Sequence, residues 1–173
     1  MTLSRRRLRS APLGRAAAGP RLAGFIYGTL IVLTLVVVGA KAYPESPGHI
    51  AALVVLTTAV LWLAHVYAHG VAQSVSRDEH LSLAQLGHIA RREGSIVEAA
   101  LPPVVPLLLA AVGLISTQVA VWAAFALGLV VLAVQGLEFA RVERLGRLGT
   151  VAAVAANLGF GVLLVGLKLV LTG

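Results

Sequence analysis

Two histidines four residues apart are the first side chains in this sequence whose type and spacing suggest chemistry. His65 and His69 lie inside a long apolar run, in the stretch WLAHVYAH. Side chains four residues apart project from one face of a helix. Two imidazoles on one face can bind a divalent metal ion such as Zn, Mn, Fe or Ni, or pass protons near neutral pH.

Two carboxylates could complete such a site. Glu98 lies near the start of the next apolar run and Glu138 near the end of the one after that, with Gln135 one helical turn away. The chain has no cysteine, so histidine and carboxylate are the metal ligands on offer. The candidate site, for a divalent metal ion or a proton relay, consists of His65, His69, Glu98 and Glu138.

The elements that position these residues are expected to lie in a membrane. The chain is 58% hydrophobic and 12% charged, whereas a soluble domain carries about 25% charged residues. The net charge of +7 would suggest a nucleic-acid partner, but the basic residues lie at the ends of apolar runs and do not form one face. We therefore expect a lipid bilayer, and no nucleic acid, as the partner.

Five apolar segments reach the length of about 20 residues that a helix needs to cross a bilayer. They run from Leu22 to Ala40, Ile50 to Val75, Ile96 to Ile115, Val119 to Ala140, and Leu148 to Leu171. The sequence predicts an all-α, polytopic integral membrane protein in which these segments form a five-transmembrane-helix bundle. The bundle is one domain, residues 22–173, after a basic cytoplasmic tail, residues 1–21, that we expect to be disordered.

The basic residues also predict the orientation of the bundle. Lysine and arginine accumulate on the cytoplasmic side of membrane proteins. All of them except Lys41 and Lys168 fall in the tail, in the gap after the second span, or in the gap after the fourth. We expect a multi-pass protein of the inner (plasma) membrane with its N-terminus in the cytoplasm and its C-terminus outside. His65, His69, Glu98 and Glu138 then all lie in the cytoplasmic leaflet.

An export signal is the alternative interpretation of the first span. The stretch SRRRLR, Ser4 to Arg9, resembles a twin-arginine signal, and Ala40 to Ala42 has the A-x-A form of a cleavage site. The apolar run is longer than a signal's central region, which argues against cleavage. After cleavage, four spans would remain in the same orientation.

The gap between the second and third spans, residues 76–95, predicts a short amphipathic helix on the cytoplasmic surface. Leu83, Leu86 and Ile89 recur at helical spacing beside polar and basic residues. Ser82 with Gln85 fits a capping box that would start the helix. The helix is either a lid or lipid-binding element, or simply a surface connector.

Each acid of the candidate site has an alternative, purely structural role. Ser95 to Glu98 fits a second capping box, in which Glu98 would reach back to the Ser95 backbone N–H. Glu138 can pair with Arg141 on the next helical turn.

The histidines have structural alternatives too. His65 can hydrogen-bond to a neighbouring helix as a neutral side chain. His69 can belong to the interfacial belt with Tyr67.

Three prolines interrupt the third span. Pro102, Pro103 and Pro106 lack backbone N–H donors and should leave carbonyls between Glu98 and Pro102 without helical partners. Such a break occurs at ion sites in transport proteins, but a kink accommodated by neighbouring helices is the simpler outcome.

Small residues predict helix contact faces, either within one chain or between copies. Gly24 and Gly28 form a GxxxG motif. The last span carries a longer surface of this kind, made of Ala152, Ala155, Ala156 and Gly159.

Transport or sensing of a small cation or protons is the function that these patterns favour. The alternative is a non-catalytic membrane subunit, or a homo-oligomer, that binds its partner through the small-residue faces. A membrane enzyme acting on lipid comes third, and we do not expect catalysis. The sequence contains no phosphate-binding loop, no GxSxG motif and no GxGxxG motif.

Overall fold

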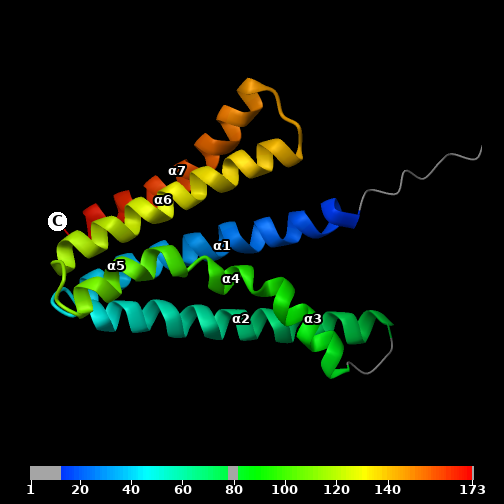
Figure 1. The fold of residues 1–173 in the computed structure, drawn as a ribbon, viewed down its shortest axis with the longest axis horizontal. Helices are drawn as coiled ribbons and strands as arrows, with labels where there is room; N and C mark the ends of the chain where they lie inside the picture. The colour runs from blue at the N-terminus through cyan, green and yellow to red at the C-terminus, as the bar shows by residue number, and fades with distance from the viewer. Residues whose placement is uncertain (1–12, 78–81, 173) are drawn as a thin grey trace, which may run out of the picture.

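The structure, a computed structural model, describes residues 13–77 and 82–172, and within these ranges it contains helices and no strand. Figure 1 shows the helices α1 (Leu13–Ala42), α2 (Pro47–Arg77), α3 (Leu83–Glu93), α4 (Ser95–Glu98), α5 (Leu101–Ala111), α6 (Thr117–Val142) and α7 (Arg147–Thr172). Four of them, α1, α2, α6 and α7, are long and apolar enough to cross a membrane. A fifth span results if α3 to α5 are counted as one bent element.

Helix α1 starts earlier than the first predicted span. It begins at Leu13, inside the segment that the sequence assigned to the tail, and so includes Arg21. Residues 1–12, with most of the predicted basic tail and the SRRRLR stretch, lie outside the described residues.

The third apolar segment is broken, as its prolines predict. Two pieces, Leu83–Glu98 and Leu101–Ala111, meet at an angle of 55°. Pro102 and Pro103 occupy the first turn of α5, where their missing N–H groups cost least. They have no N–H to offer the carbonyls of Glu98 and Ala99, so the preceding helix cannot continue through them. The predicted span from Ile96 to Ile115 is therefore bent at the end that carries Ile96, where α4 makes only a single turn.

Helix α3 confirms the predicted amphipathic helix. The Ser82 hydroxyl accepts a hydrogen bond from the Gln85 backbone at 3.2 Å, and the Gln85 side chain accepts one from the Ser82 N–H at 2.7 Å. This is the predicted capping box, and Gly94 follows the helix at the other end. Ile89 is buried, whereas Leu83 is 88% exposed, so only the second half of α3 packs against the bundle.

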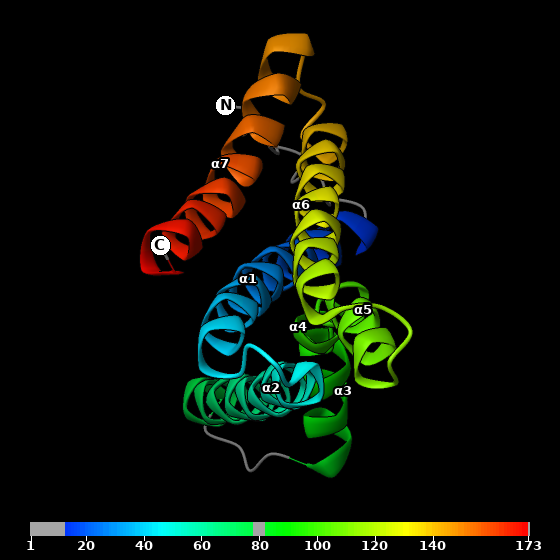
Figure 2. The ribbon, with the colours of Figure 1, turned by 90° about the vertical axis from the view of Figure 1, so that its left-hand side faces the viewer.

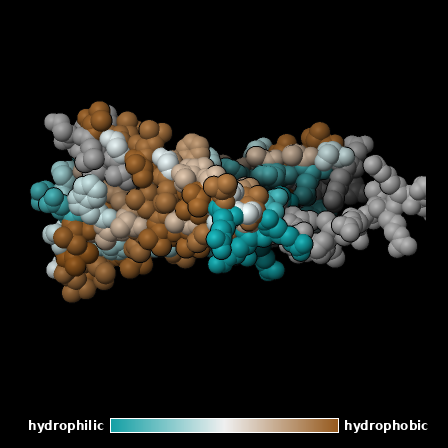
Figure 3. All heavy atoms as spheres, turned by 90° about the horizontal axis from the view of Figure 1, so that it is seen from above, coloured by the Kyte–Doolittle hydropathy of each residue, from teal (hydrophilic) through white to brown (hydrophobic). Residues whose placement is uncertain are grey.

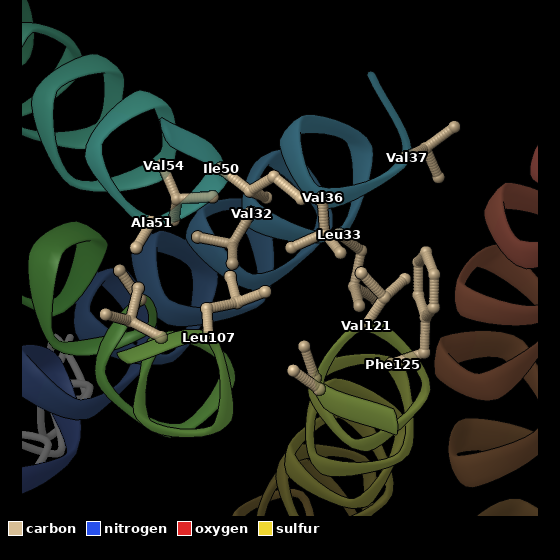
Figure 4. Close-up of a cluster of buried hydrophobic side chains, with 14 of the residues drawn as sticks. Val32, Leu33, Val36, Val37, Ile50, Ala51, Val54, Leu107, Val121 and Phe125 are labelled. Carbon is tan, nitrogen blue, oxygen red and sulfur yellow. The ribbon is translucent and has the colours of Figure 1, made fainter. Parts of the chain in front are cut away.

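The core lies where α1 and α5 are held between α2 on one side and α6 on the other (Figures 1 and 2). Apolar side chains from these four helices meet there and are almost completely buried (Figure 4). The largest of them are Val32, Leu33, Val36, Ile50, Val54, Leu107, Phe125 and Leu132. Helix α7 packs on α6 and α1 at the edge, and only 6% of its most apolar stretch is buried.

Two glycines allow helix backbones to touch. A Cβ at Gly28 would lie 2.8 Å from the carbonyl oxygen of Ile96, so α1 and α4 touch through their backbones. A Cβ at Gly136 would lie 2.8 Å from the Cα of Val154, which shows the same contact between α6 and α7. The GxxxG face of α1 is thus used inside the chain.

Candidate functional site

The structure divides the four predicted site residues between two pockets at the same end of the bundle. The histidine pocket has a volume of about 290 Å³ and is lined by Ala23, Gly24, Tyr27, His65, His69, Arg92, Glu93 and Ile96. The glutamate pocket has a volume of about 500 Å³ and is lined by Arg21, Leu22, Phe25, Glu98, Val130, Val131, Val134, Gln135 and Glu138. The α1 residues of the two pockets lie on opposite faces of that helix.

The two histidines and the two glutamates therefore do not form one cluster. Within the described ranges, no three His, Asp or Glu side chains gather closely enough to hold a metal ion. The sequence placed all four residues near one end of the bundle, and the structure agrees. The histidines and the glutamates are separated because they point from different helix faces into different pockets. Figure 3 shows hydrophilic residues gathering toward this end and hydrophobic residues covering much of the visible face beyond it.

The two imidazoles are oriented by the backbone of their own helix. Nδ1 of His65 lies 2.9 Å from the carbonyl oxygen of Leu61, and Nδ1 of His69 lies 3.0 Å from that of His65. A carbonyl can only accept, so Nδ1 carries the proton in each ring. In a neutral ring Nε2 is then the free acceptor, ready to take a proton or to bind a cation. Both hydrogen bonds stay within α2. The hydrogen bond that His65 makes is therefore to its own helix and not, as predicted, to a neighbouring one.

Aromatic and carboxyl groups extend the pair of histidines into a row. The Tyr27 ring lies 5.6 Å from the His65 ring, and the His65 and His69 rings are 6.4 Å apart and roughly parallel. At the far end, Oε1 of Glu93 lies 3.8 Å from Nδ1 of His69, an electrostatic contact that is too long for a hydrogen bond. We call Tyr27, His65, His69 and Glu93 the titratable row.

Sequence reasoning missed two members of this row, Tyr27 and the more deeply buried Glu93. Glu93 ends α3, it is only 8% exposed, and Nε of Arg92 lies 3.8 Å from its carboxylate. A buried carboxylate needs such partners, because desolvation of an unpaired charge is costly. The signal was in the sequence, since Glu93 lies four residues after Ile89 and therefore on the apolar face of the amphipathic helix.

A hydrogen bond joins α3 to α2. The indole Nε1 of Trp62 donates to the carbonyl oxygen of Ala90 at 2.9 Å. Trp62 lies one turn before His65, and Ala90 lies one turn before Glu93. This bond therefore fixes the two helices next to the titratable row.

Glu98 forms an ion pair in place of the predicted cap. Its carboxylate oxygens lie 3.0 and 3.3 Å from Nη2 of Arg21. Helix α4 has no side-chain cap, and the buried Ser95 hydroxyl has no hydrogen-bond partner within the described part of the chain. The predicted capping box from Ser95 to Glu98 is therefore wrong, because the carboxylate turns toward α1.

Glu138 and Gln135 lie one turn apart on α6 and face the same pocket. Glu138 is exposed, and the predicted ion pair with Arg141 is not among the salt bridges of the described residues. Gln135 is only 4% exposed, and neither its Nε2 nor its Oε1 has a protein hydrogen-bond partner in the described structure. A buried amide without partners is uncommon and calls for an explanation.

Comparisons of the chain with protein-family models, curated proteins and solved structures found no match. The chemistry of both pockets must therefore be argued from their own residues. The histidine pocket offers imidazole and carboxyl groups, and the glutamate pocket offers an apolar cavity with a polar amide and a carboxylate that has no ion pair among the described residues.

Proposed function

We propose that the chain is a small integral membrane protein that binds protons or a small cation in its histidine pocket, in order to transport or to sense them. The observation that carries this proposal is the titratable row, in which Tyr27, His65, His69 and Glu93 follow one another at the end of the bundle. Ionisable groups within apolar helices are costly, and they commonly mark ion or proton pathways.

The row favours protons over a tightly held metal ion. A divalent transition metal is normally held by three or more protein ligands, and the described residues contain no such group. Proton transfer needs less, because each step involves only one donor and one acceptor. Glu93 would exchange a proton with His69, and His69 with His65, in each case through a bridging water, because the Glu93–His69 contact of 3.8 Å is too long for direct transfer. In this scheme Arg92 balances the charge of Glu93 when the histidines are neutral.

The proposed membrane arrangement is the one that the basic residues favour. The helices α1, α2, α6 and α7 span the plasma membrane, and α4 with α5 forms the fifth span. The N-terminus is cytoplasmic, so the titratable row faces the cytoplasm and the apolar core closes the outer half. A transport cycle would have to open that core, whereas a sensor would not.

Orientation can be measured with single cysteines, because the chain has none of its own. Glu45→Cys lies in the turn between α1 and α2, and Glu143→Cys lies in the turn after α6; both positions are exposed. A membrane-impermeant maleimide should label Glu45→Cys in intact cells and Glu143→Cys only after permeabilisation. The reverse pattern would overturn the proposed orientation.

Flux in liposomes separates transport from sensing. The purified chain is reconstituted, a pH gradient is applied, and proton movement is followed with a dye inside the liposomes. Flux that disappears in the double variant His65→Ala, His69→Ala supports transport. The matched control is His49→Ala, because His49 is exposed at the opposite end of α2, where it stacks on Tyr43. Flux that persists in the double variant would remove the row from the mechanism.

Sensing predicts a pH-dependent signal without flux. In a Trp122→Phe background, Trp62 is the only tryptophan and lies one turn from His65. Protonation of His65 should quench its fluorescence, and His65→Ala should abolish that pH dependence. A flat fluorescence profile between pH 5 and 8, together with no flux, would refute both forms of the proposal.

A second candidate function is that of a membrane subunit which binds a partner through α7. The observation that favours it is the exposure of the small-residue face of α7, since Ala152, Ala155, Ala156 and Gly159 are all exposed. Faces of this kind pack helices together in membranes. Co-purification of a partner that is lost after Ala156→Leu, but not after Ala64→Leu on the exposed side of α2, would support it.

A further inference from the structure

The glutamate pocket contains a polar group that the fold itself does not use. Gln135 lines the pocket, and both atoms of its amide are buried without a hydrogen-bond partner among the described residues. Leaving one buried polar atom unpaired costs about 1–3 kcal/mol. A side chain that only filled space here would be apolar, like its neighbours Val131 and Val134.

We infer that the glutamate pocket binds an organic ammonium compound with an apolar body and a carbonyl or ester oxygen close to the ammonium group. This inference is independent of the proposed function, because none of the residues of the titratable row lines this pocket.

The amide determines the hydrogen-bonding pattern of the ligand. Nε2 of Gln135 can only donate and Oε1 can only accept, so the ligand must present an acceptor and a donor side by side. An ammonium group can donate to Oε1, and a nearby carbonyl oxygen can accept from Nε2, so a ligand with these two groups satisfies both atoms of the amide. A pure hydrocarbon satisfies neither and would leave the cost of the buried amide in place.

The charges around the pocket favour a cation. Arg21 and Glu98 neutralise each other through their ion pair. Glu138 has no such partner among the described salt bridges, and it lies one turn from Gln135 on the same helix. The net charge left at the pocket is therefore that of one carboxylate, which attracts an ammonium group and repels an anion.

The apolar walls of the pocket determine the size and polarity of the rest of the ligand. Apart from its polar groups, the pocket is lined by Leu22, Phe25 and three valines, and its volume of about 500 Å³ lies within the range of small-molecule sites, about 300–1,000 Å³. Val130 and Val134 are 58% and 48% exposed, so the pocket is open at the side of α6. A molecule with a chain can therefore enter laterally, from the surrounding bilayer.

Two sources share this chemistry: a phosphatidylethanolamine lipid and a free amphipathic amine. They differ in the phosphate. Arg21 uses only Nη2 toward Glu98 and has other N–H donors available. A phosphate beside the ammonium group would contact them. Arg21→Gln should therefore weaken binding of the lipid but leave binding of a free amine unchanged.

The test uses the full chain, purified in detergent, and two probes. Phosphatidylethanolamine represents the lipid, and N-(2-aminoethyl)dodecanamide represents the free amine. Dissociation constants are obtained from the shift of the thermal unfolding midpoint with probe concentration. Gln135→Leu should raise the dissociation constant of each of these probes that binds the unaltered chain about tenfold or more, and Glu138→Gln should do the same. Because Glu138 is exposed, its variant tests the site even where Gln135→Leu alters the fold.

Matched controls lie on the same helix. Gln118→Leu and Glu143→Gln make the same chemical changes outside the pocket. Gln118 is exposed on α6, and Glu143 is exposed just after it. Both variants should bind the probes as tightly as the unaltered chain does. N-Propyldodecanamide, which keeps the amide but lacks the amine, should not bind. The inference is overturned if neither probe binds, if this neutral amide binds as well as the amine, or if both pocket variants bind as tightly as the controls.

Discussion

Replacing Gly28 by alanine tests how tightly α1 and α4 are packed. A Cβ at this position would lie 2.8 Å from the carbonyl oxygen of Ile96, 3.0 Å from its Cα and 3.0 Å from the Cβ of Ala99. Two of these atoms belong to the backbone of α4, and the third is bonded to the backbone of Ala99, the residue that follows α4. None can rotate away, so the two helices must move apart.

The size of the effect follows from a comparison with a second glycine. Overpacking a tight contact costs about 1–3 kcal/mol. Alanine also gains about 1 kcal/mol over glycine inside a helix, which partly offsets that cost. Gly159→Ala on α7 receives the same gain, but its Cβ meets nothing within 4 Å. The helix term cancels between the two variants, so Gly28→Ala should be less stable than Gly159→Ala by about 1–3 kcal/mol.

Equilibrium unfolding in mixed micelles measures this difference. The fraction of sodium dodecyl sulfate is raised, and the fluorescence of Trp62 and Trp122 is followed. The unfolding transition of Gly28→Ala should move to a lower detergent fraction than that of Gly159→Ala. Equal midpoints for the two variants would show that α1 and α4 are not in backbone contact, and would refute the arrangement that separates the two pockets.

Three further substitutions have defined outcomes. Arg21→Gln should lower the free energy of unfolding by less than about 1 kcal/mol, since its ion pair with Glu98 is largely exposed; a larger loss in the same micelle assay would mean that the pair is shielded from solvent. Trp62→Phe removes the hydrogen bond to Ala90 and should cost about 1 kcal/mol and speed cleavage of α3 in limited proteolysis, so unchanged cleavage would contradict the role given to that bond. Gln135→Leu should stabilise the ligand-free chain by about 2–6 kcal/mol, because it removes two buried atoms that have no partner among the described residues, at about 1–3 kcal/mol each; a lower thermal midpoint would show that the amide is satisfied.

Local sequence signals predicted local structure well. The Ser82 and Gln85 pair started α3 as expected, because a capping box depends only on residues three positions apart. The prolines after Glu98 broke the third apolar segment, because the loss of N–H groups acts within one helical turn.

The composition of the site could not be predicted in the same way. Apolar runs place a residue along the length of a span, but they do not determine which neighbour its side chain faces. Glu98 and Glu138 were therefore grouped with the histidines, although α1 lies between the two pairs. The second capping box failed for a similar reason. Arg21, from a segment distant in sequence, binds the Glu98 carboxylate that the box would have used.

The short length of α5 has an electrical consequence. Its 11 residues, at about 1.5 Å each, extend about 17 Å, roughly half of the 30 Å hydrocarbon layer of a bilayer. In the proposed orientation α5 occupies the outer half, while the inner half contains the two pockets. Water and charge in those pockets would bring the cytoplasmic potential close to the midplane. The membrane voltage would then fall mostly across the outer half, where the field would be about twice that in an unmodified bilayer.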